Sequence, residues 1–87
     1  MIQSRVTRSF RAAFASLPDE IQARARRAYH LFRDHPEHPS LRFKKVAQLE
    51  NIYSVRIGLG YRALGVLERS TVIWFWIGSH ADYDRMI

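Results

Sequence analysis

The spacing of apolar residues changes once along this chain, and that change is the strongest constraint on its fold. In residues 6–33 apolar side chains recur every three or four positions, which is the period of an amphipathic α-helix. From residue 41 onward they alternate with polar residues or form short β-branched and aromatic runs, as strands do. Residues 34–40 (DHPEHPS) lie between the two regions, and their two prolines predict an extended connector. We therefore expect an α+β fold with helices first and a sheet second.

Two helices are predicted in the first region, at residues 6–17 and 18–33. Pro18 occupies a position that helix starts accept, and Asp19 and Glu20 suit a helix N-terminus because of the helix dipole. A short strand could precede the first helix at residues 2–5, but the pattern there is too brief to decide.

Four strands are predicted in the second region, at residues 41–46, 52–57, 62–67 and 71–77. The short breaks at 58–60 and 68–70 make the last three an antiparallel meander, and the residues after 77 leave room for a short C-terminal helical turn. The two helices should pack on one face of this mostly antiparallel sheet. A chain of 87 residues is expected to form one domain, residues 1–87.

The strand register places two arginines together. If each turn has three residues, Arg56 lies opposite Arg62 and Arg62 lies opposite Trp76, all on one face. The other face collects the more apolar set and should carry the helices: Tyr53, Val55, Ile57, Ala63, Leu67, Ile73, Phe75 and Ile77. Two arginines across a strand pair disfavour the sheet unless an anion neutralises them. A bound phosphate would do so, and the alternative is that they reach into water or pair with Asp82 or Asp84.

The arginine face is also predicted to carry an apolar patch. Its members are Leu64, Val66, Val72 and Trp74, and we expect a protein partner to cover them. Trp76 offers a surface on which RNA bases could stack, although tryptophans in strands more often serve packing.

Three histidines invite chemical interpretations. His80 follows the strand that carries Trp76, so it can lie at the same end of the sheet as Arg56 and Arg62. Histidine transfers protons near neutral pH and arginines hold phosphate, which together describe a metal-free ribonuclease site. The alternative is that His80 and Tyr83 only cap and pack the terminal turn. His35 and His38 lack a third ligand nearby, so we expect an ordinary turn there, with no metal and no cofactor.

The charge of the chain points to a polyanion or to a partner with an acidic surface. Fourteen Lys and Arg against eight Asp and Glu give a net charge of +6, and twelve of the cations are arginines, which pair with phosphate through two nitrogens. Residues 1–33 carry seven arginines and two acids (+5), and residues 34–87 carry seven cations and six acids (+1).

Without cysteine, disulfides and thiol chemistry are excluded. No apolar run approaches the roughly 20 residues of a membrane span, so we expect a cytoplasmic protein without a membrane partner.

The segments YSVRIGLGYRALGV and WFWIGSHADYDRMI, with the order of elements around them, resemble the RelE/ParE superfamily of small bacterial toxins from type II toxin–antitoxin systems. The resemblance covers essentially the whole chain. It implies a compact fold of two helices against a mostly antiparallel sheet, a cognate antitoxin as partner and, for the RelE branch, ribosome-dependent cleavage of mRNA that inhibits translation.

The resemblance also implies roles for particular residues. Arg62 matches the arginine after the hairpin turn, and His80 and Tyr83 match the acid/base and tyrosine positions near the C-terminus. Arg56 matches a basic residue on the preceding strand. The basic residues that follow the connector, Lys44 and Lys45, fall where RelE members place further basic residues for RNA. Two other functions remain open: the ParE branch inhibits DNA gyrase without its own chemistry, and a toxin-derived domain can bind a partner without any activity.

Overall fold

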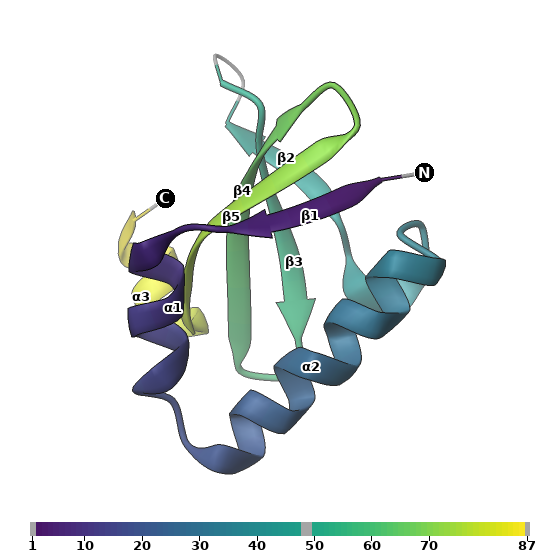
Figure 1. Ribbon diagram of the computed structural model, residues 1–87. Helices are drawn as coiled ribbons and strands as arrows, with labels where there is room; N and C mark the ends of the chain where they lie inside the picture. Colours follow the sequence, from purple (N-terminus) through teal and green to yellow (C-terminus); the bar gives the residue numbers. More distant parts are fainter. Residues whose placement is uncertain (1, 48–49, 87) are drawn as a thin grey trace.

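The computed structural model describes residues 2–47 and 50–86, which form one five-stranded sheet flanked by helices (Figure 1). The elements in chain order are β1 (Gln3–Val6), α1 (Arg8–Ala15), α2 (Asp19–Asp34), the 3₁₀ helix η1 (Pro39–Leu41), β2 (Lys44–Ala47), β3 (Ile52–Ile57), β4 (Tyr61–Glu68), β5 (Thr71–Ser79) and α3 (His80–Met86). The strand order is β1-β5-β4-β3-β2, with β1 parallel to β5 and the other pairs antiparallel. The predicted α+β class is confirmed.

Side-chain hydrogen bonds satisfy both ends of α1. The Thr7 hydroxyl accepts a hydrogen bond from the Phe10 N–H at 3.1 Å and so caps α1. The Gln22 side chain of α2 donates to the carbonyl oxygens of Phe14 and Leu17, at 3.1 and 3.0 Å, and satisfies the end of α1. Both predicted helices are present, and their ends lie within two residues of those expected.

The strands differ from the prediction at the N-terminal side of the sheet. Residues 3–6 form β1, the brief segment whose pattern was indecisive, and it adds a fifth strand at the edge beside β5 (Figure 1). The strand predicted at 41–46 begins only at Lys44, because Pro39–Leu41 form a 3₁₀ turn and buried Leu41 packs into the core. Arg42 then adopts the left-handed conformation (φ 47°), which no strand residue adopts.

The first hairpin has the predicted register and the second does not. Arg56 lies opposite Arg62 across a three-residue turn in which Gly58 has φ +60°. In the second hairpin Glu68 pairs with Thr71, so the turn has two residues, and a β-bulge in β5 shifts the register again beyond Trp74. Arg62 consequently lies opposite Gly78, and the prediction that it faces Trp76 is wrong.

The two shifts exchange residues between the faces of β5, because a slip of one residue moves a side chain to the other side of a sheet. Val72 and Trp74 belong to the helix-covered core, with exposures of 0% and 6%, and Ile73 takes the far face opposite Val66. The indole of Trp74 packs edge-on against Phe32, and its Nε1 donates to the Ser4 hydroxyl at 3.2 Å.

α1 and α2 pack on one face of the sheet, and α3 packs on the other (Figure 1). The core between the first two helices and the sheet is built from these buried residues: Ala25, Phe32, Leu41, Val55, Ile57, Ala63, Val72, Trp74 and Ile77. On the opposite face Tyr83 of α3 is buried against Arg62. No helix in the described ranges is long and apolar enough to cross a membrane.

Candidate functional site

A small basic pocket of about 190 Å³ lies at the turn end of the β3–β4 hairpin. Its lining residues are Arg42, Arg56, Leu59, Tyr61, Arg62 and His80. Three guanidinium groups, an imidazole and a phenol thus meet without a carboxylate among the lining residues. Such a set favours an anion with several oxygen acceptors, as a phosphate group has.

The hairpin register and α3 together position the two paired arginines. Arg56 Nε donates to the carbonyl oxygen of Gly58 at 2.9 Å, which fixes this side chain beside the turn. Arg62 Nη1 donates to the buried Ser54 hydroxyl at 3.4 Å, and its guanidinium carbon lies 5.2 Å from the centre of the Tyr83 ring. The ring therefore supports Arg62 by a cation–π contact.

The acidic residues of α3 do not neutralise these arginines. Asp82 pairs with Arg85 at 3.2 Å, and the carboxylate of Asp84 lies 3.7 Å from His80 Nε2. Within the described residues no carboxylate comes within 4.0 Å of the guanidinium of Arg56 or Arg62. The charge of these two arginines thus remains available to a bound anion.

His80 is anchored at the first position of α3. Its backbone N–H donates to the carbonyl oxygen of Gly60 at 2.7 Å, which ties the start of α3 to the β3–β4 turn. The imidazole stacks on Tyr83 with a centroid distance of 5.9 Å, and half of its side-chain surface is exposed. Packing therefore fixes the ring while one side stays open to the pocket.

Arg42 and Tyr61 line the pocket although the sequence did not single them out. Arg42 directly follows η1, and its backbone N–H donates to the Pro39 carbonyl oxygen. His38 caps the start of η1, where its Nδ1 accepts a hydrogen bond from the Ser40 N–H at 3.2 Å. The left-handed backbone at Arg42 directs the chain from η1 into β2. A proline at the first position of a short helix is the sequence signal that could have revealed this turn.

The other predicted RNA-binding residues are more dispersed. Lys44 pairs with Ser54 and so shares the arginine face, whereas Lys45 pairs with Tyr53 and belongs to the other face. Trp76 also lies on the arginine face, and its ring occupies the space where a Cβ on Gly78 would lie, with a nearest distance of 2.6 Å. Trp76 therefore packs over the backbone and is half-buried.

The four residues predicted as one partner-binding patch do not lie together on the surface. Leu64 is on the arginine face but only 2% exposed, and Val66 beside it is half-buried. Val72 and Trp74 lie in the helix-covered core, for the register reason given above. The prediction of an open patch formed by all four is wrong.

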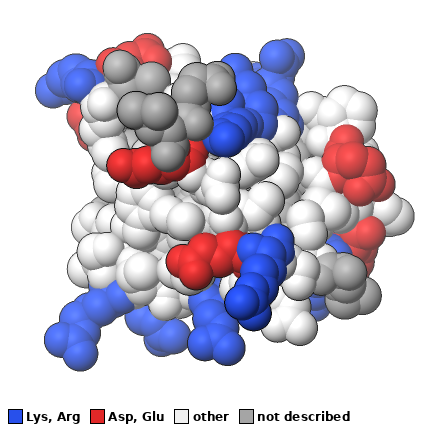
Figure 2. Space-filling model, turned by 90° about the horizontal axis from the view of Figure 1, so that it is seen from above, with Lys and Arg blue, Asp and Glu red and all other residues white. Residues whose placement is uncertain are grey.

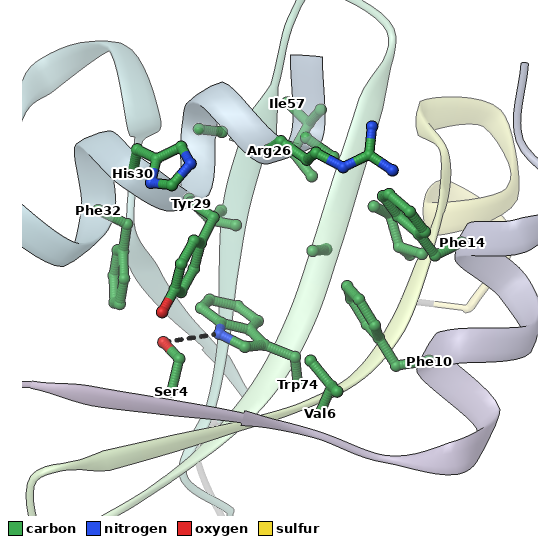
Figure 3. Close-up of a pocket in the computed structure, with 15 residues that line it drawn as sticks. Ser4, Val6, Phe10, Phe14, Arg26, Tyr29, His30, Phe32, Ile57 and Trp74 are labelled. Atoms are coloured by element: carbon green, nitrogen blue, oxygen red, sulfur yellow. Dashed lines mark hydrogen bonds between the residues drawn. The ribbon is translucent and has the colours of Figure 1, made fainter. Parts of the chain in front are cut away.

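A larger, mostly apolar pocket of about 440 Å³ opens between α1, α2 and β1 on the helix side of the sheet (Figure 3). Phe10 and Phe14 of α1 and Tyr29 of α2 surround it together with Trp74 (Figure 3). Arg26 lies over the Phe14 ring at 5.2 Å. This pocket suits apolar side chains or groups, in contrast to the small basic pocket.

The basic pocket lies within a segment that has recognisable relatives: residues 19–85 match the model of the ParE-like toxin domain. The chain belongs to this family. The match includes every residue that lines the basic pocket. A comparison of this toxin domain with curated proteins gives no match.

Solved structures of toxins share the fold of this toxin domain. The RelB–RelE antitoxin–toxin complex from Methanococcus jannaschii has 19% identity and a TM-score of 0.74, over 95% of this chain and 99% of that chain. The RelBE2 toxin–antitoxin complex from Mycobacterium tuberculosis has 25% identity and a TM-score of 0.65, over 91% and 98%. The isolated RelE toxin from E. coli has 10% identity and a TM-score of 0.69, over 100% of both chains. The resemblance to the RelE/ParE superfamily is thereby confirmed.

Proposed function

We propose that this toxin domain is the toxin component of a type II toxin–antitoxin system and that it cuts mRNA on the ribosome, which stops translation. The observation that carries this proposal is the pocket in which Arg42, Arg56 and Arg62 meet His80 without a lining carboxylate. A gyrase inhibitor acts by binding alone and has no need of a proton-transferring side chain in a phosphate-sized pocket. The pocket therefore supports phosphate chemistry on a nucleic acid.

The reaction that suits this pocket is attack of a ribose 2′-hydroxyl on the adjacent phosphorus. His80 takes the proton of the 2′-hydroxyl as the O2′–P bond forms. Arg56 and Arg62 stabilise the charge that develops on the non-bridging oxygens, because their nitrogens are already fixed when the charge appears. The P–O5′ bond breaks, and the 5′ oxygen takes a proton from the Tyr61 phenol or from water. Tyr83 is buried and acts by holding Arg62 and His80 in place.

A cognate antitoxin completes the proposal, as the relatives solved as toxin–antitoxin complexes suggest. The apolar pocket between α1 and α2 is the surface of this chain that suits such a partner, since Tyr29 and Val6 are 43% and 39% exposed there. Arg26 and His30 also line it. An amphipathic segment with acidic residues next to its apolar side chains would complement both features.

The test is cleavage mapping in a cell-free translation reaction. Wild-type protein should produce new mRNA 5′ ends on ribosomes, and His80→Ala should lower the rate by about 10²- to 10⁴-fold, the usual contribution of a positioned acid or base. Arg62→Ala should lower it by about 10²- to 10³-fold. His30→Ala is the matched control, because His30 lies on the other face of the sheet and should leave cleavage unchanged.

Intact mRNA during growth arrest would refute the ribonuclease proposal. If the arrest instead brought double-strand DNA breaks that persist in His80→Ala, the chain would be a gyrase inhibitor. If overproduction had no effect on growth, it would be a partner-binding domain without activity. Each variant should first be shown to unfold at the same temperature as the wild type.

A further inference from the structure

A second basic pocket lies on the other side of the β3–β4 turn. It has a volume of about 450 Å³ and is enclosed by α2, η1 and the turn. Its charged lining residues are Arg24, Arg27 and Arg56, and its other lining residues are neutral. In Figure 1 the β3–β4 turn lies at the end of the sheet that α2 crosses.

The two basic pockets are joined through the turn. Arg56 and Leu59 line both of them. Arg56 uses one N–H, on Nε, to hold the Gly58 carbonyl oxygen at 2.9 Å, which leaves the four N–H groups of its terminal nitrogens for bound anions. An anion in either pocket can therefore reach the same guanidinium group.

Arg24 and Arg27 differ in what they can offer a ligand. Arg24 pairs with Glu20 at 3.2 Å and packs on the turn so closely that a Cβ on Gly58 would lie 3.1 Å from its Nη1. Its role is therefore to support the turn. Arg27 is exposed, and no carboxylate in the described part of the chain lies within 4.0 Å of its guanidinium. Arg27 and Arg56 thus supply the uncompensated charge of this pocket.

Leu59 lies between the two pockets at the tip of the turn. It is 83% exposed, the largest exposure among the exposed large hydrophobic residues of the described chain. An apolar tip between two cationic pockets matches a single nucleic-acid strand, in which phosphates alternate with bases that present apolar faces. A single bound anion would gain nothing from Leu59.

We propose that the pocket formed with Arg27 is a second phosphate-binding subsite for the RNA strand that enters the catalytic pocket, with Leu59 in contact with a base between the two. This inference rests on the proposed function, since it takes RNA to be the substrate. It makes Arg27 and Leu59 residues that bind the RNA and take no part in the chemical step.

The experiment measures binding apart from cleavage. The probe is a single-stranded RNA of roughly ten nucleotides, fully 2′-O-methylated so that it lacks the attacking hydroxyl, and its affinity is followed by fluorescence anisotropy over a range of salt concentrations. Arg27→Gln is compared with Arg11→Gln, an exposed arginine of α1 that lines neither basic pocket. Both variants lower the net charge from +6 to +5, so long-range attraction falls equally and only the local contact differs.

Arg27→Gln should reduce the salt slope of the binding constant by about 0.7 and weaken binding roughly fivefold near 0.1 M salt, which is the contribution of one phosphate contact to a single strand. Arg11→Gln should reduce the slope by much less. Leu59→Ala should weaken binding without changing the slope, because it removes an apolar contact.

Equal slopes and affinities for Arg27→Gln and Arg11→Gln would overturn the subsite, and would be expected if the pocket served an acidic protein segment. Cleavage of unmodified mRNA on ribosomes is scored separately. If wild type binds the probe in the expected pattern but cuts no mRNA, the proposed function fails and the subsite stands. If it cuts mRNA and Arg27→Gln binds the probe like Arg11→Gln, the subsite fails and the function stands.

Discussion

Tyr83 links the two functional side chains that the reaction needs. Its ring stacks on His80 and lies under the guanidinium of Arg62, and only 8% of the residue is exposed. A buried ring in contact with both groups acts by positioning them, because little of its surface is free to stack on an RNA base. Its hydroxyl is therefore less important than its ring.

This role predicts different effects for two substitutions of Tyr83. Tyr83→Phe keeps the ring and should leave the cleavage rate within about twofold of wild type. Tyr83→Leu keeps an apolar residue but removes the cation–π contact, and should lower the rate by roughly 2- to 30-fold, equivalent to about 0.5–2 kcal/mol. The rates are measured at saturating mRNA and well below the unfolding temperature of each variant. An equal loss for both substitutions would instead indicate that the hydroxyl transfers a proton.

The residues of the small basic pocket could be predicted from the sequence only where a local feature, such as a turn, determines their position. Arg56 and Arg62 were paired correctly because glycines at both ends of a three-residue turn set the register of that hairpin. Arg42 was missed because its place depends on a left-handed backbone, which arginine seldom adopts.

At the level of elements, β5 shows what the pattern of side chains leaves undecided. Its residues are apolar almost throughout, so the pattern does not say which of them face the helices. The turn before it contains no glycine, and Arg69 adopts φ 56° to close it with two residues. The bulge then restores the face of Trp76 and Ile77 that the simple register had predicted. The helices were easier to predict because each carries a single apolar stripe along one face.

The register of β5 requires glycine at position 65. A Cβ there would lie 2.5 Å from Val72 Cγ1 and 2.7 Å from Trp74 Cε3, both in the core. Gly65→Ala should therefore lower the free energy of unfolding by about 1–3 kcal/mol, as overpacking does. Gly60→Ala is the matched control, since a Cβ at Gly60 would meet nothing within 4 Å. Urea unfolding measures both variants, and an equal loss of stability would contradict this account of β5.

Across the whole molecule, charge and chemistry are located in different places. Residues 1–33 carry +5 and residues 34–87 carry +1, yet every residue that lines the small basic pocket belongs to the second group. On the face shown in Figure 2, Lys and Arg side chains lie in separate groups with Asp and Glu between several of them. The net charge therefore acts at long range on a polyanion, and the local cluster of Arg56, Arg62 and His80 acts on one phosphate.

This separation predicts different behaviour for two double variants of equal net charge. Arg8→Gln/Arg11→Gln on α1 and Arg56→Gln/Arg62→Gln in the pocket each lower the charge from +6 to +4. Both should slow association with ribosomes and weaken its dependence on salt, because both reduce the attraction to a polyanion. At saturating ribosomes the α1 variant should cut mRNA at the wild-type rate, whereas the pocket variant should be slower by at least about 10²-fold. Stopped-flow association and single-turnover cleavage measure the two steps separately. If the α1 variant were also slow at saturation, the helical charge would take part in the chemical step and the two roles would not be separable.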